Sequence, residues 1–152
     1  MRALIVPPGG GSTPATTTVG SFPRSRTLLL VLKARKEGKI TEAEFQEVAD
    51  QAVLETLKLQ ERVGIDVVTD GEQRRDNFYS FVSEKLDGVK LMSLAEMLDY
   101  VEDKATFERL LQSLDVPAYS INNPTCVGRL SRRQPLALDE LKFLKQHTDK
   151  PI

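Results

Sequence analysis

The chain is poor in the residues that most often carry metal and redox chemistry. Among its 152 residues there is one cysteine, Cys126, one histidine, His147, and no tryptophan. A protein zinc site needs three or four ligands, drawn mainly from cysteine and histidine. We therefore expect this chain to contain no metal site of its own. The single cysteine excludes an intrachain disulfide and fits a reducing compartment, and we expect His147 to be a solvated residue near a helix end.

Net charge and long apolar runs are also lacking. The 21 basic and 22 acidic residues give a formal net charge of −1, which leaves no electrostatic footprint for nucleic acid or an anionic membrane. No apolar run approaches the ~20 residues of a membrane helix. The start of the chain is rich in glycine and proline and has no long apolar region of the signal-peptide kind. These features predict a cytoplasmic protein with a flexible leader over residues 1–15.

The rest of the chain, residues 16–152, alternates between strand-like and helix-like stretches. Strand-like stretches lie at 16–22, 65–69 and around 125–128, and helix-like stretches lie at 24–37, 41–63 and 138–147. A capping box formed by Thr41 and Glu44 begins the longest helix, and Gly64 ends it. A second capping box, Ser93 with Glu96, begins a predicted helical insertion near 90–115. This series indicates the α/β class.

The apolar run at 65–69 is short and rich in β-branched residues, as expected of a buried parallel strand. Acids, amides and guanidinium groups follow it at once: Asp70, Glu72, Arg74, Asp76 and Asn77. The carboxyl ends of such strands are where open α/β sheets and (β/α) barrels build their sites. These side chains are therefore the best-placed ligand-binding candidates that the sequence offers.

Two motifs together resemble the catalytic barrel of cobalamin-independent methionine synthase, within the superfamily that includes uroporphyrinogen decarboxylase. The first is Thr16-Thr17-Thr18-Val19-Gly20-Ser21-Phe22-Pro23, and the second is Asp70-Gly71-Glu72 with Arg74, Asp76 and Asn77. The segment Thr125–Arg129 resembles the family's next block more loosely. The resemblance implies a partial TIM (β/α)₈ barrel, about its first three βα units, over residues 16–152, since a complete barrel takes ~250 residues.

In that family, a zinc-bound homocysteine thiolate takes a methyl group from a methyl-folate in methionine biosynthesis. By resemblance, Val19, Gly20 and Ser21 would bind the amino-acid carboxylate, and Glu72 would bind the ammonium. The remaining implied substrate-binding residues are Arg74, Asp76 and Asn77 at the rim and Arg129 toward the folate. The family's zinc ligands come from later strands, so we expect no catalytic or metal-binding residue here, no cofactor bound by this chain alone, and no methyl transfer by the isolated chain.

Each candidate also has a structural alternative. Ser21 could cap a helix ahead of Pro23, and Glu72 could be a carboxylate favoured at a helix start. Arg74 and Arg75 could form a solvated pair. Cys126 could be a small buried hydrophobic residue.

Other functions stay open as well. The chain could be a truncated paralogue that acts as a non-catalytic interaction or structural module, as a homo-oligomer or paired with a complementary barrel fragment. The reading frame beyond Ile152 would discriminate this module from the methyltransferase. A decarboxylase would use basic residues for a polycarboxylate, and Asp70 and Glu72 argue against it; the arginines available to it are Arg24, Arg26, Arg74, Arg75 and Arg129.

Overall fold

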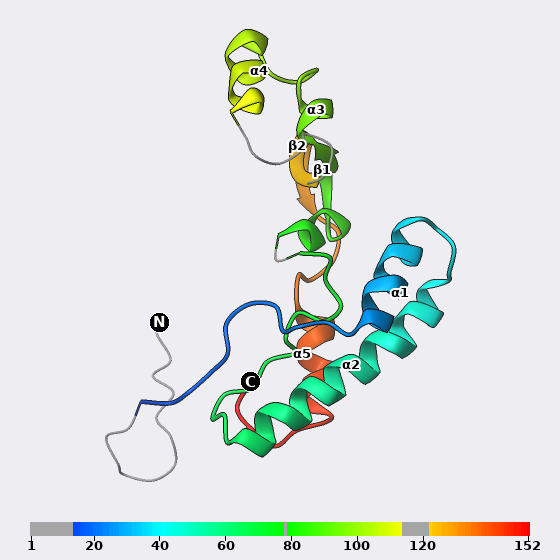
Figure 1. Ribbon diagram of the computed structural model, residues 1–152, viewed down its shortest axis with the longest axis vertical. Helices are drawn as coiled ribbons and strands as arrows, with labels where there is room; N and C mark the ends of the chain where they lie inside the picture. Colours follow the sequence, from blue (N-terminus) through cyan, green and yellow to red (C-terminus); the bar gives the residue numbers. More distant parts are fainter. Residues whose placement is uncertain (1–13, 78, 114–121) are drawn as a thin grey trace. The chain divides into compact units, whose positions relative to one another are not determined.

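The computed structural model describes residues 14–77, 79–113 and 122–152 and divides into two compact units (Figure 1). Unit 1 consists of residues 1–78 and 137–152, and unit 2 of residues 79–136. The leader predicted for residues 1–15 lies outside the described residues, except for its last two. No helix in the described parts of the chain has the length and apolar character that a membrane crossing requires.

Two helices of unit 1 form a hairpin. Helix α1 (Arg26–Lys36) is capped by the side chain of Ser25, and helix α2 (Glu42–Val63) begins with the predicted capping box of Thr41 and Glu44. Helix α2 ends at Gly64, whose φ of 84° is the left-handed conformation that glycine adopts without strain. The bounds predicted for α2 are therefore confirmed, and α1 is two residues shorter at its start than expected.

Helix α2 packs on both sides because its apolar stripe is wide. Toward α1 it contributes Phe45 and Ala49, which surround the fully buried Leu28. Toward helix α5 (Leu138–Lys145) it contributes Val53 and Leu57, which pack with Val68 and Leu144. Burial of such side chains is the main stabilising contribution to a fold of this size.

Three extended segments of unit 1 lie side by side. Thr17 and Val67 form a parallel bridge, and the Val67 N–H donates to the Thr16 carbonyl at 3.0 Å. On the other side, the Val68 N–H donates to the Pro151 carbonyl at 2.9 Å. The segment 65–69 is thus central, and the predicted parallel arrangement of the first two strand-like stretches is observed. The last residues of the chain supply its other neighbour.

Unit 2 is built on a two-stranded antiparallel ribbon. Strand β1 (Leu86–Ser93) pairs with strand β2 (Asn122–Arg132), and a register shift lies between Asp87 and Val89. At that point Gly88 adopts a φ of 75°, and a Cβ there would lie 2.4 Å from the Arg129 carbonyl oxygen. Only glycine fits this close approach. The short helices of the unit are η1 (Ser80–Glu84), α3 (Leu94–Met97) and α4 (Lys104–Gln112).

Two expectations about this region are corrected. The stretch around 125–128 is extended, but it pairs antiparallel with β1 and is no third parallel strand in the described structure. The insertion near 90–115 does hold α3 and α4, and the capping box of Ser93 and Glu96 is confirmed. However, residues 86–93 form a strand, so the insertion is a ribbon with helices rather than a helical excursion.

Candidate functional site

The two predicted motifs meet where the segments 16–18 and 65–69 end. The hydroxyl groups of Thr18 and Thr69 lie 3.0 Å apart. Gln60 of α2, with 1% of its surface exposed, accepts from the Thr69 N–H at 3.0 Å and donates to the Thr69 carbonyl at 2.7 Å. Its side-chain oxygen also accepts from the Thr18 hydroxyl at 3.0 Å. Gln60 therefore fixes both segment ends against α2, in keeping with the rule that buried polar groups are hydrogen-bonded.

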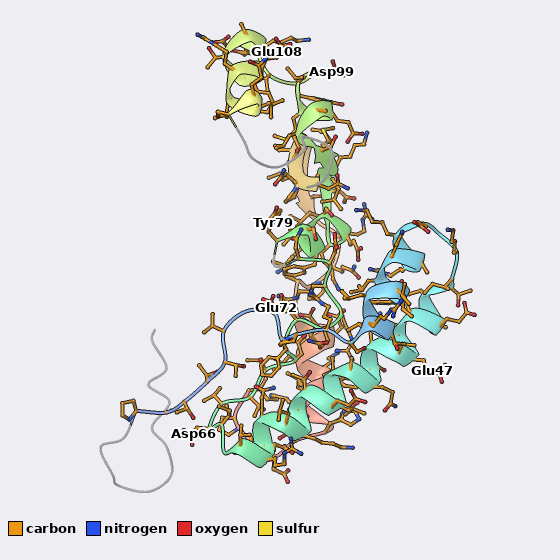
Figure 2. All side chains as sticks on the ribbon, in the orientation of Figure 1. Glu47, Asp66, Glu72, Tyr79, Asp99 and Glu108 are labelled. Carbon is orange, nitrogen blue, oxygen red and sulfur yellow. The ribbon has the colours of Figure 1, made fainter. Side chains whose placement is uncertain are left out.

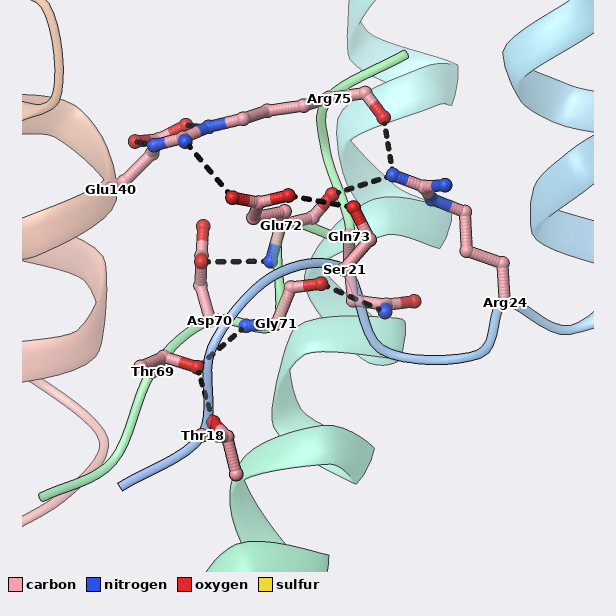
Figure 3. Close-up of polar contacts among 10 residues, drawn as sticks. All are labelled: Thr18, Ser21, Arg24, Thr69, Asp70, Gly71, Glu72, Gln73, Arg75 and Glu140. Atoms are coloured by element: carbon pink, nitrogen blue, oxygen red, sulfur yellow. Dashed lines mark hydrogen bonds and ion pairs between the residues drawn. The ribbon is translucent and has the colours of Figure 1, made fainter. Parts of the chain in front are cut away.

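Beyond these threonines, Ser21 and Glu72 come into direct contact. The Ser21 hydroxyl donates to Glu72 Oε2 at 2.6 Å, across 51 residues of sequence (Figure 3). The backbone is tied at the same level, because the Phe22 N–H donates to the Gly71 carbonyl at 2.9 Å. Val19 is 95% exposed, and Gly20 has a φ of 82°. The residues predicted to bind the two ends of an amino acid are therefore neighbours, and the loop before them is accessible.

Glu72 has a backbone conformation that is uncommon for a residue with a side chain. Its φ is 53°, in the left-handed region, where a residue with a Cβ costs about 1–2 kcal/mol. The Glu72 N–H donates to Asp70 Oδ1 at 2.9 Å, and the Glu72 carbonyl accepts from Arg24 Nη2 at 3.0 Å. Arg24 Nη2 also donates to the Arg75 carbonyl at 2.8 Å, so one guanidinium group holds two carbonyls of the turn (Figure 3).

Asp70 is 8% exposed, and its second carboxylate oxygen, Oδ2, is buried without a hydrogen-bond partner. Burial raises the pKa of Asp70, and the charge of Glu140 raises it further. The N–H of Glu72 and the charges of Arg75 and Arg74 act in the opposite direction and do not cancel the effect of burial. A buried carboxylate with a raised pKa beside candidate ligand-binding groups is a feature of functional sites.

The side chains of Arg74 and Arg75 are hydrogen-bonded to other residues of unit 1. Arg74 donates from Nε and Nη2 to Asp50 Oδ1 at 3.2 and 2.5 Å, and its guanidinium lies 4.1 Å from the ring centroid of Phe143. Arg75 donates to Glu140 at 2.9 and 2.5 Å, which raises the pKa of Arg75. Their side chains are only 11% and 16% exposed. The alternative of a solvated arginine pair is therefore wrong.

The other predicted residues lie farther from this contact or in the other unit. Asp76 is exposed, and Asn77 is half-buried, in the turn that follows Arg75. Arg129 is exposed on β2 of unit 2. The structure thus brings together Ser21 and Glu72, with Gly20 adjacent. The roles of Asp76, Asn77 and Arg129 stay predictions.

Three further structural alternatives are wrong. The residue that caps α1 is Ser25, whose side chain accepts from the Leu28 N–H, so Ser21 is no helix cap. Residues 71–74 form turns, so Glu72 stands at no helix start. Cys126 is exposed rather than buried. His147, by contrast, is exposed just beyond α5, as predicted, and stacks on Phe143.

Sequence reasoning missed the supporting residues of the site. Gln60 falls on the apolar stripe of α2, four residues after Thr56 and seven after Val53, and a polar residue in that position is a signal of a buried hydrogen-bonding role. Glu140, which pairs with Arg75, carries no comparable local signal, because the charged residues Asp139 and Lys142 stand near it in the sequence. Asp50, which pairs with Arg74, is the one charged residue in the sequence from 48 to 54, and a charge in such a stretch of helix α2 is a usable signal.

Within residues 14–77, 79–113 and 122–152, no group of three or more His, Cys, Asp or Glu side chains could hold a metal ion. The residues described therefore do not fit the zinc that the family resemblance implies, and no step of a reaction can be assigned to a metal held by them.

Comparisons with known proteins agree with the two motifs. The family model described as cobalamin-independent synthase, catalytic domain, matches residues 14–152. Methionine synthases of Sulfurisphaera tokodaii and Pyrococcus furiosus are 44% and 31% identical over 86% and 90% of this chain. A 5-methyltetrahydropteroyltriglutamate–homocysteine methyltransferase of Thermotoga maritima is 26% identical over 90% of it.

A solved structure is also similar. It is that of a B12-independent methionine synthase from Shewanella sp. W3-18-1 in complex with selenomethionine, with a TM-score of 0.57 and 25% identity over 90% of this chain. This chain covers 36% of that protein, 33% and 35% of the Sulfurisphaera and Pyrococcus synthases, and 16% of the Thermotoga enzyme. It therefore spans about a third or less of the relatives it matches. Because the match extends over almost all of its residues, the chain belongs to the family of cobalamin-independent synthase catalytic domains.

Proposed function

We propose that these residues form the amino-acid-binding edge of a methyltransferase that moves a methyl group from a methyl-folate to a homocysteine-like thiol. Family membership and the names of the relatives support this reaction. Since the chain spans about a third or less of those relatives, the activity is proposed for a protein in which the remaining barrel segments are also present. The chain alone is expected to bind part of the substrate and to leave the methyl group in place.

The observation that carries the proposal is the 2.6 Å hydrogen bond between Ser21 and Glu72. Homocysteine is a zwitterion, so its site needs donors for the carboxylate and a carboxylate for the ammonium. In our proposal, the backbone at Val19 and Gly20 and the hydroxyl of Ser21 bind the carboxylate. Glu72 accepts from the ammonium in a charge-assisted hydrogen bond. The hydroxyl of Ser21 can rotate from Glu72 to the ligand, because a serine hydroxyl both donates and accepts.

The remaining substrate contacts are proposed from the family resemblance. Asp76 and Asn77 would line the rim, and Arg129 would face polar parts of the folate. Arg74 would shape the rim indirectly, since its guanidinium is bound to Asp50. The zinc implied by the family is assigned to no residue of this chain.

We also propose that the three neighbouring extended segments are the first strands of a (β/α)₈ barrel. The parallel bridge between Thr17 and Val67 and the hydrogen bond from Val68 to Pro151 support this arrangement. The ribbon of unit 2 would then be an insertion between the second strand and helix α5. A cytoplasmic location stays a prediction from the sequence.

Calorimetric titration of the chain with L-homocysteine, kept reduced, tests the proposed binding edge. Ser21→Ala and Glu72→Gln should each weaken binding, whereas Asp87→Asn in unit 2, which alters an exposed ion pair with Arg133, should leave it unchanged. Methyl transfer is then assayed with the product of the complete reading frame, methyl-folate and added zinc. Absence of turnover with any thiol acceptor would reject the proposed reaction.

We further propose that the chain associates with a second copy or with a complementary barrel fragment when it is isolated. Apolar side chains exposed on the helices of unit 1 support this; they are Leu29 at 52%, Leu30 at 59%, Leu59 at 38% and Val63 at 62%. Exposed apolar groups of this kind favour association. A single monomeric species in sedimentation velocity at micromolar concentration would contradict it.

A further inference from the structure

The backbone of Glu72 is held in a conformation that its own side chain disfavours. Among the described residues, it is the one non-glycine residue with a positive φ, at 53°. Such a conformation persists only where surrounding contacts fix it, and it is often found at functional sites. The direction of the Glu72 side chain depends on this angle, because φ sets where the Cβ points relative to the incoming chain.

The side chains of Asp70 and Arg24 form hydrogen bonds with the peptide groups on either side of Glu72. Asp70 Oδ1 accepts from the Glu72 N–H at 2.9 Å, and Arg24 Nη2 donates to the Glu72 carbonyl at 3.0 Å. Between these contacts the Glu72 carboxylate accepts from the Ser21 hydroxyl at 2.6 Å and lies 3.7 Å from Arg75 Nη1 (Figure 3). The direction of the Glu72 carboxylate is thus set by the conformation of the Glu72 backbone as well as by Ser21 and Arg75.

We propose that Asp70 is a positioning residue: its carboxylate fixes the Glu72 backbone in the left-handed conformation and so directs the Glu72 carboxylate toward Ser21. The inference deepens the proposed function, on which its relevance to homocysteine rests. Asp70 itself touches no ligand, because its free oxygen is buried.

Burying the carboxylate of Asp70 is energetically costly, so we infer that its charge contributes to the bond with the Glu72 N–H. An asparagine would offer the same acceptor to the Glu72 N–H without placing a carboxylate at 8% exposure with Oδ2 unpartnered. A charged acceptor makes a stronger bond to an N–H than a neutral one. Charged groups surround this carboxylate: Arg74 and Arg75 favour its ionised form, and Glu140 opposes it. The stronger hydrogen bond from the Glu72 N–H to Asp70 offsets the backbone strain that comes from the positive φ of Glu72.

The first test follows the free protein by NMR and needs no ligand. In the 152-residue chain, nuclear Overhauser effects should join the side chains of Ser21 and Glu72. Asp70→Ala should remove them and retain those between Thr18 and Thr69, whereas Asp70→Asn, which keeps an acceptor but makes a weaker bond, should weaken them and retain those between Thr18 and Thr69. Ser21–Glu72 effects that persist at full strength in Asp70→Ala would overturn the proposal, and effects at full strength in Asp70→Asn would overturn the part that the charge plays in it.

A second measurement uses the unaltered chain, so it tests the hydrogen bond between Asp70 and the Glu72 N–H even if Asp70→Ala fails to fold. The Glu72 amide proton should move during an acid titration together with the carboxyl carbon of Asp70, because the two groups share a hydrogen bond. A Glu72 amide that does not respond to the titration of Asp70 would also overturn the proposal.

Homocysteine binding separates this inference from the proposed function. Asp70→Ala should weaken binding by about tenfold to a hundredfold, since a small misplacement of a binding group has effects of that size. Asp66→Ala, which removes a comparable carboxylate–backbone bond to Thr16 near the start of the same segment, should leave affinity unchanged. If Glu72→Gln does not weaken binding, the proposed function fails. If Glu72→Gln weakens binding and Asp70→Ala does not, only the positioning role fails.

Discussion

Arg75 and Glu140 join the polar turn after the central extended segment to helix α5 through a two-pronged ion pair, with N–O distances of 2.9 and 2.5 Å. Both side chains are largely buried, at 16% and 14% exposure. The same guanidinium lies 3.7 Å from Glu72, so it links the candidate site to the core of unit 1 (Figure 3).

Glu140→Gln should destabilise the chain because it removes the charge of the carboxylate that accepts two hydrogen bonds from the largely buried guanidinium of Arg75. Removing one partner of a hydrogen bond to a charged, largely buried group costs about 1–3 kcal/mol. Asp87→Asn is the matched control: its pair with Arg133 is about half exposed, and exposed pairs contribute about 0–1 kcal/mol. Urea unfolding of both variants measures the difference, and equal losses would show that Arg75–Glu140 is no more than a surface pair.

Gly71→Ala should be more damaging than an alanine at another left-handed glycine. At Gly71, with a φ of 62°, a Cβ would lie 2.8 Å from Thr56 Cγ2 and 3.0 Å from Phe22 Cβ. At Gly64, with a φ of 84°, a Cβ would meet nothing within 4 Å. Gly64→Ala should therefore cost about 1–2 kcal/mol from backbone strain alone.

Gly71→Ala should add about 1–3 kcal/mol of overpacking to the same backbone strain. Thermal unfolding compares the two variants. Similar melting temperatures would mean that Phe22 and Thr56 do not confine Gly71.

Glu72→Gln should lower homocysteine affinity more than it lowers stability. The substitution keeps the shape of the side chain and removes the charge that the substrate ammonium would pair with. Losing one partner of a partly buried charge pair costs about 2–5 kcal/mol of binding, a loss of tens-fold or more. Calorimetric affinity and the melting temperature are measured on the same sample. Unchanged affinity with a melting temperature lowered by several degrees would make Glu72 a purely structural residue.

Local signals predicted the parts of this fold that local chemistry determines. The bounds of α2 follow from Thr41, Glu44 and Gly64, which cap the helix through their own neighbours. The meeting of Ser21 and Glu72 follows from the rule that neighbouring parallel strands present their carboxyl ends at one edge. The helix bounds could therefore be read from residue types and spacing, whereas the pairing of Ser21 with Glu72 at one site was implied by the family resemblance.

Partners that are distant in sequence could not be predicted in the same way. The stretch around Cys126 has the composition of a strand, but composition does not specify whether the partner runs parallel or antiparallel. Its partner, Leu86–Ser93, alternates poorly because Gly88 and the register shift interrupt it. The hydrogen bonds of Asp50 and Glu140 to the two arginines depend on the packing of helices α2 and α5. Figure 2 shows the side chains of both helices.

Two aspartates of one segment should respond to pH with opposite signs. Burial raises the pKa of Asp70 above its ordinary 3.8, so between pH 3.8 and its folded pKa the folded chain binds more proton than the unfolded chain. The free energy of unfolding therefore falls as pH rises through that window, and the penalty is complete above the folded pKa. For Asp66, hydrogen bonds from the Thr16 N–H and hydroxyl lower the pKa, so its contribution is stabilising at neutral pH and is lost in acid.

Asp70→Asn should accordingly raise the melting temperature at pH 7, and the gain should shrink as the pH falls toward 3.8. Asp66→Asn should lower the melting temperature at pH 7, and that loss should shrink in acid. Thermal unfolding of the two variants and the parent between pH 2 and pH 7 measures both differences, since the contribution of Asp66 is lost only below pH 3.8. The pairing with the parent removes the effect of all other carboxyl groups. A melting temperature that Asp70→Asn lowers at pH 7 would mean that the burial of Asp70 does not destabilise the folded chain, and the charge argument for its positioning role would lose its basis.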